Sequence, residues 1–260
     1  MYALAEHEAY ISRRLQRYGI AEEKYRIACS VVRVLARIPF VRMISVVNTL
    51  AISAADRDSD IDIFIISERK HVWLARLLCV AYLQLIRKRP TAKTKTDMIC
   101  ASFFASDDAL DLSSLQIQPD PKTGFGDLYL AWWVSRIVPI YDAGEYAKKF
   151  FDANEWASRV FPNRRFYYTS SLRTVRLGLV FRGMKVCMEA FISLGGSFFE
   201  GMSRFIQMRS LPQDLRSLLN RDTRVVMNDH VLKFHVRDTR EEFREKFIKM
   251  CEMYDIHFSS

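Results

Sequence analysis

The stretch Ser59-Asp60-Ile61-Asp62-Ile63 places two carboxylates one residue apart within an apolar run. Successive side chains of a β-strand point to opposite faces, so Asp60 and Asp62 would share one face. Two like charges side by side repel each other and lose hydration on burial. A divalent cation removes this penalty, and Mg²⁺ accepts carboxylate oxygens while leaving positions for water and phosphates. The pair indicates a magnesium site for phosphoryl chemistry; the alternative is two ordinary surface acids on an edge strand.

A third carboxylate on a neighbouring strand would complete a two-metal clamp. Asp97 is the best placed, because it stands at the start of the next predicted strand, residues 97–105. It could instead be a strand-cap or loop acid, and Asp107, Asp108 and Asp111 compete for the role.

These acids need a framework of strands and helices, and the apolar periodicity predicts one. Residues 50–58 read as a loop or short helix, and residues 87–96 as a basic loop. The regular elements predicted before residue 139 are helices over 6–18 and 22–37, strands over 40–47, 61–66 and 97–105, and buried helices over 72–86 and 128–138, the last closed by Pro139.

The second half of the chain is predicted to be mainly helical. Helices are expected over 146–160, through most of 162–208, over 212–219 and over 239–254, with a hairpin over 225–236. We therefore expect a core that includes the N-terminal helices in residues 1–145 and a mainly helical region in residues 146–260.

The order of these features resembles the nucleotidyltransferase superfamily, which includes DNA polymerase beta, aminoglycoside nucleotidyltransferases and minimal nucleotidyltransferases. Its signature is an apolar strand, Gly-Ser, a spacer, then Asp-x-Asp in a second apolar strand. Here Asn48-Thr49 stands where Gly-Ser is expected, Thr49 lies eleven positions before Asp60, and Ser53 occupies a position where many members have a second glycine. The likeness covers residues 40–66 well and extends loosely to residue 104. The segments VVNTL, ICASFFASDDALDL and DLYLAWW are also similar to an uncharacterised bacterial group described as nucleotidyltransferase-like.

The resemblance implies an α+β fold, a nucleotidyltransferase-type mixed sheet flanked by helices. It implies a magnesium-dependent enzyme that moves a nucleoside monophosphate from a nucleoside triphosphate to a hydroxyl acceptor, which could be a small molecule, RNA or protein. Two Mg²⁺ ions would bind Asp60, Asp62 and Asp97, and Asn48, Thr49 and Ser59 would contact the nucleotide. The alternative is a weakly active or inactive protein of this fold that binds a nucleotide or a protein partner, because the Asn48 side chain occupies space that the phosphates would need.

This chemistry sets a geometric expectation. The three carboxylates should converge to within roughly 3–6 Å in an open cleft, given the separations of paired metal ions and the length of magnesium–oxygen bonds. Thr49 should border that cleft, and the C-terminal helical region should form its opposite wall.

Composition bears on the partners and the cellular location that we expect for the protein. The formal net charge of +9 favours an anionic partner. The five cysteines are widely spaced and odd in number, so we expect reduced core residues in a cytoplasmic protein. Charged residues near the start argue against a signal peptide, and no segment has the length of apolar residues that a membrane span needs. The oligomeric state stays open.

Several other features have two interpretations. Arg87, Lys88, Arg89, Lys93 and Lys95 could steer a triphosphate or nucleic acid, or form a solvated loop. Tyr129, Trp132 and Trp133 could stack a base or belong to the core. Residues 175–199 could lie on a membrane surface, although packing against the core is favoured. We expect structural roles for two histidines, His230 and His235.

Overall fold

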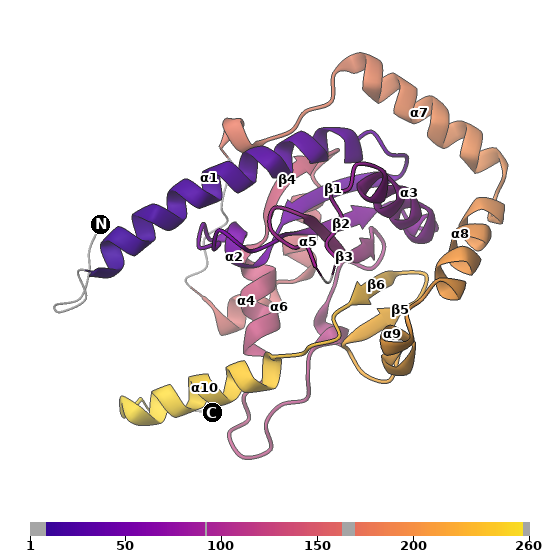
Figure 1. Ribbon diagram of the computed structural model, residues 1–260. Coiled ribbons are helices and arrows are strands. Elements are labelled where there is room, and N and C mark those ends of the chain that lie inside the picture. Colours follow the sequence, from indigo (N-terminus) through magenta and orange to yellow (C-terminus); the bar gives the residue numbers. More distant parts are fainter. Residues whose placement is uncertain (1–8, 92, 163–169, 257–260) are drawn as a thin grey trace.

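The computed structural model of the protein describes residues 9–91, 93–162 and 170–256. One six-stranded sheet crosses the molecule, with the strand order β4-β1-β2-β3-β6-β5 (Figure 1). β2 and β3 run parallel, and every other neighbouring pair is antiparallel. This mixed sheet flanked by helices confirms the α+β class. The strands are Val41–Val46 (β1), Ile61–Ser67 (β2), Ile99–Ser106 (β3), Val138–Asp142 (β4), Val225–Met227 (β5) and Val231–Phe234 (β6).

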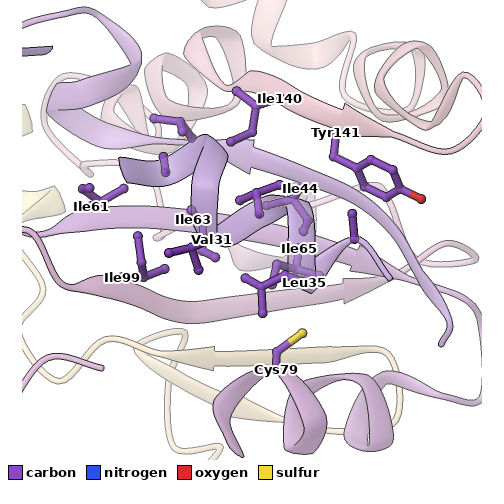
Figure 2. Packing of buried hydrophobic residues seen from close by; sticks show 14 of the residues in the cluster. Val31, Leu35, Ile44, Ile61, Ile63, Ile65, Cys79, Ile99, Ile140 and Tyr141 are labelled. Carbon is purple, nitrogen blue, oxygen red and sulfur yellow. The ribbon is translucent and has the colours of Figure 1, made fainter. Parts of the chain in front are cut away.

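Helices cover both faces of the sheet, because its central strands carry apolar residues on both sides. The isoleucines of β2 at positions 61, 63 and 65 turn to one face, where they contact α1 (Ala9–Leu35) and α3 (Val72–Leu85) (Figure 2). Phe64 and Ile66 turn to the other face. Three helices cover that second face: α4 (Leu128–Arg136), α5 (Tyr146–Ala153) and α6 (Trp156–Val160).

Two predictions about the N-terminal half are wrong in detail. The separate helices expected over 6–18 and 22–37 form one continuous helix, α1, in the part that the structure describes. Gly19 does not interrupt it, since a helical glycine costs only about 1 kcal/mol and the following turns are held by buried residues such as Tyr25 and Val32. The helix expected over 128–138 ends at Arg136, and Val138 instead begins β4, an edge strand that contains Pro139.

The C-terminal region adds both helices and strands. The predicted hairpin is confirmed as β5 and β6, and β6 pairs with β3, so the sheet draws on both halves of the chain. The helices here are α7 (Leu179–Leu194), α8 (Phe198–Arg209), α9 (Gln213–Leu218) and α10 (Arg240–Met253). α8 contacts α3, and α10 contacts α4. None of the helices in the described ranges has the length and apolar character needed to cross a membrane.

Candidate functional site

Asp60 and Asp62 lie at the entrance of β2. Asp60 directly precedes the strand, and Asp62 is its second residue. By strand alternation both lie on the face of Phe64 and Ile66, which is the face covered by α4, α5 and α6. The two carboxylates therefore lie on the side of the sheet opposite α3, and both are partly buried.

The third possible metal ligand beside this pair is a thiol. Asp60, Asp62 and Cys100 can place one ligand atom each within 4.8 Å of one another. Cys100 comes from β3, where it stands directly opposite Asp62 in the parallel register. Sequence reasoning did not identify Cys100, because a single sequence does not show which residues of two parallel strands face each other.

Asp97 is not part of this group. It lies two residues before β3 with a left-handed backbone, φ 57°, and its carboxylate accepts a hydrogen bond from Lys24 Nζ at 2.8 Å. Lys24 comes from α1, is almost fully buried, and also donates to the carbonyls of Arg57 and Ser59. The structure thus engages Asp97 in holding the loop before β2. Among the described residues, the group with ligand atoms within 4.8 Å of one another contains two carboxylates and no Asp97, and a buried cation holds the Asp97 carboxylate.

The other acids named as candidates are engaged elsewhere. Asp107 accepts a hydrogen bond from the Arg69 backbone N–H, and Asp111 accepts bonds from Ser113. Asp108 accepts a bond from the Ser106 hydroxyl and lies 3.2 Å from the Nδ1 atom of His230.

The segment between β1 and β2 contacts the carboxylate pair through Asn48. It begins with α2 (Asn48–Ala51). Asn48 takes a left-handed backbone, φ 56°, and its Nδ2 donates to Asp62 Oδ2 at 2.8 Å. Ser53 is also left-handed, with φ 53°. A left-handed backbone is uncommon outside glycine, with asparagine as the main tolerated exception. Both positions at which the resemblance expects glycine therefore have a conformation that glycine favours.

Thr49 and Ser59 differ in the surroundings of their hydroxyl groups. The Thr49 side chain is exposed at the first turn of α2. The Ser59 hydroxyl instead donates to the Asp56 carbonyl at 2.8 Å, within the loop that leads to Asp60. Thr49 can therefore meet a ligand without rearrangement, whereas Ser59 stabilises the loop.

Burial and like charge dominate the electrostatics of the site. The pKa of Asp62 is raised to about 6, mainly by burial and then by the charge of Asp60, and hydrogen bonds from Asn48 and Cys100 limit the rise. Burial and the charge of Asp62 raise the pKa of Cys100 to about 12, so this thiol is neutral near pH 7. The result is one carboxylate, Asp62, that is destabilised in its charged form, beside the neutral thiol of Cys100.

Aromatic side chains of α4 and α10 stand near the carboxylates. Burial raises the pKa of Tyr129, and the charge of Asp62 adds to the effect. The Tyr129 ring contacts Trp132, with ring centroids 5.8 Å apart, and Phe243 of α10 at 5.6 Å. Trp133, by contrast, lies in the core, stacked on Phe103. Among the C-terminal helices, α10 contacts α4 and lies beside these aromatic side chains, whereas α8 contacts α3.

A basic cleft of about 490 Å³ is lined by residues of α1, α2 and α4, among them Ala51 and Trp132. Its charged side chains are Arg14, Arg136 and Arg173, accompanied by Tyr25 and Trp132. Arg14 also donates to the carbonyls of Ile52 and Ser53. This cleft could not be predicted from the sequence, because its arginines come from three separate helical segments.

The two remaining sequence features are peripheral. The described part of the basic segment, residues 87–91 and 93–96, is largely exposed. His235 is half-buried, and its pKa is lowered to about 4, first by loss of hydration and then by the charge of Lys233.

No protein-family model matches this sequence, and no curated protein is significantly similar to it.

Proposed function

We propose that this protein is a magnesium-dependent nucleotidyltransferase, with a nucleoside triphosphate as substrate and a hydroxyl group as acceptor. The observation that carries the proposal is the position of Asp60 and Asp62, side by side at the entrance of a central strand. The turn before them supports it, because Asn48 and Ser53 have left-handed backbones where the resemblance expects glycine. The parallel pairing of β2 with β3 supports it as well, since it brings a further side chain to the pair.

Of the three possible ligands, the carboxylates of Asp60 and Asp62 fit Mg²⁺ and the Cys100 thiol does not. Carboxylate oxygens suit a hard cation, whereas a neutral thiol does not. Asp60 and Asp62 would hold the metal, with its remaining positions left to water and phosphates. When bound, the metal supplies positive charge against the phosphates and the leaving pyrophosphate. A second ion at Asp97 would require that carboxylate to leave its ion pair with Lys24.

The neighbouring residues have roles that follow from their contacts. Asn48 holds the Asp62 carboxylate through its amide, which fixes the orientation of that group. Thr49 offers an exposed hydroxyl to a phosphate. The arginines of the basic cleft would attract the anionic part of the triphosphate or of the acceptor.

The test measures pyrophosphate release with each nucleoside triphosphate, Mg²⁺, and small-molecule, RNA and protein acceptors. We expect Asp60→Asn and Asp62→Asn each to lower the rate by about two orders of magnitude or more. Asp58→Asn is the matched control, because Asp58 is an exposed acid of the same loop. Full activity in both site variants would rule the proposal out.

The second candidate is a protein that binds a nucleotide or a protein partner without turnover. Two observations favour it: Cys100 stands opposite Asp62, and Lys24 holds Asp97. Calorimetry with Mg²⁺ and ATP separates the two functions. Binding without pyrophosphate release supports this second candidate, and absence of binding counts against any nucleotide function.

A further inference from the structure

The outer faces of α7 and α8 are apolar, the reverse of what a helix on a protein surface normally shows. In Figure 1 both helices lie at the outside of the fold, with α7 set apart from the sheet. Eight apolar side chains on them, Val180 and Val186 among them, have exposed fractions between 54 and 86 %. The six largest define the apolar surface discussed below: Leu179, Met184, Phe191, Leu194, Phe198 and Phe205.

Polar residues attach α7 to the rest of the molecule. Lys185 is buried, and its Nζ donates to the Ala36 carbonyl at 2.9 Å. Glu189 accepts hydrogen bonds from the Phe40 backbone N–H and from Arg42. Lys185 and Glu189 therefore face the rest of the molecule and Arg182 lies at the edge of the helix. The outward side of α7 is uncharged.

α8 is attached in the same way. Glu200 accepts hydrogen bonds from the backbone N–H groups of Trp73 and Leu74, at 2.8 and 2.9 Å. Gln207 Nε2 donates to the Trp73 carbonyl at 2.7 Å. These bonds fix α8 on α3 and direct its phenylalanines outward. Several large apolar side chains exposed together mark an interaction site.

The charges around the surface favour an anionic partner. Residues 176–209 contain five basic and two acidic side chains. Both acids, Glu189 and Glu200, are turned inward and hydrogen-bonded. Arg176, Arg182 and Arg209 remain exposed at the rim. A second copy of this chain would bring the same basic rim against itself, in a protein that already carries a net charge of +9.

We infer that α7 and α8 bind the surface of an anionic lipid bilayer, with the six apolar side chains in the lipid and the rim arginines at the headgroups. This is the arrangement of an amphipathic helix that lies in the plane of a membrane. α7 has 16 residues, a length of about 24 Å, which is shorter than the roughly 30 Å hydrocarbon core. Each rim arginine adds attraction to acidic headgroups, and this attraction is weakened by salt.

The orientation of the sheet leaves the carboxylates free in the bound state. α7 contacts residues 40–42, which pair with the Ser67 end of β2, whereas Asp60 and Asp62 lie at its opposite end. The lipid proposal therefore does not rest on the proposed chemistry, and either can fail alone.

The experiment is co-sedimentation of the full chain with phosphatidylcholine vesicles, with and without phosphatidylserine. We expect binding to the anionic vesicles that weakens as salt is raised. The double variant Phe191→Gln, Leu194→Gln should lower partitioning by about tenfold or more. Arg176→Glu with Arg209→Glu should lower binding to anionic vesicles selectively.

The control is the double variant Leu85→Gln, Met253→Gln, which removes equally exposed apolar side chains from α3 and α10. It should bind vesicles like the unmodified chain, and circular dichroism should show that all variants are folded. Equal binding by the α7 variant and the control would overturn the proposal. So would absence of vesicle binding, whether the chain is a monomer or a dimer that the α7 variant dissociates; the dimer would identify a second copy as the partner.

Discussion

Asp62 is a residue whose position costs stability. Its pKa of about 6 lies above the value of 3.8 for an ordinary aspartate, so the folded state binds a proton that the unfolded state releases between these values. Below about pH 4 Asp62 is protonated in both states and does not reduce the free energy of unfolding. As the pH rises from there through 6, the folded state loses this proton and the free energy of unfolding falls.

We therefore expect Asp62→Asn to raise the free energy of unfolding of the metal-free protein by about 1–3 kcal/mol at pH 7. The gain should disappear near pH 4, and Mg²⁺ should reduce it at pH 7 by stabilising the unmodified protein. Urea unfolding with a chelator, across this pH range, measures the difference. A gain that is independent of pH would contradict the electrostatic explanation.

Cys100 is the second decisive residue, because it stands where a third carboxylate would meet the pair. Cys100→Asp should tighten Mg²⁺ binding about tenfold, and should lower stability in the absence of metal because three acids then share the site. Calorimetric titration with Mg²⁺ tests the first part. Cys100→Asn is the control, since it adds the same bulk without charge. Tightening by both variants would show that charge is not the cause.

At the scale of the elements, α3 begins with backbone N–H groups that its N-cap residue, His71, leaves without a side-chain cap. Glu200 of α8 accepts from two of them, so the two helices stabilise each other. Glu200→Ala should lower the free energy of unfolding by about 1–2 kcal/mol and speed amide exchange at Trp73 and Leu74. Glu245→Ala, at an exposed position on α10, is the control. Unchanged exchange in the Glu200 variant would contradict this role.

The sequence predicts the elements better than the site. β1, β2 and α3 follow from apolar runs that end at polar or turn residues, and structure and prediction agree within a few residues. β4 was missed because Val138 ends an apolar helical run and Pro139 reads only as the residue that closes that helix. The role of Asp97 depends on Lys24, which is 73 positions away, and that of Cys100 on strand register. Neither relation leaves a local pattern in the chain.

At the scale of the whole molecule, Arg240 joins segments that are far apart in the sequence. Its guanidinium donates to the Leu115 carbonyl, to the Thr223 hydroxyl and to Asp127, the residue that caps α4. Both members of the Arg240–Asp127 pair are almost fully buried. The pair connects α10 to α4, and so holds Phe243 beside Tyr129.

Removing one member of a buried ion pair leaves the other charge uncompensated. Arg240→Met should therefore lower the free energy of unfolding by about 3–5 kcal/mol. The double variant Arg240→Met, Asp127→Asn should recover part of this loss. Denaturant unfolding of the four proteins in the cycle measures the coupling. Strict additivity would contradict a direct interaction between the two side chains.

The two edges of the sheet also have a consequence for how the protein behaves at high concentration. At the β4 edge Pro139 lacks an N–H group, and Val175 donates its backbone N–H to the Ile140 carbonyl at 2.7 Å. At the β5 edge Leu219 bridges to Val225, and Asn220 bonds to Met227. Each edge is thus partly occupied by its own chain and offers a poor template for strand addition. At high concentration this protein should therefore not grow into amyloid-like fibrils by strand addition.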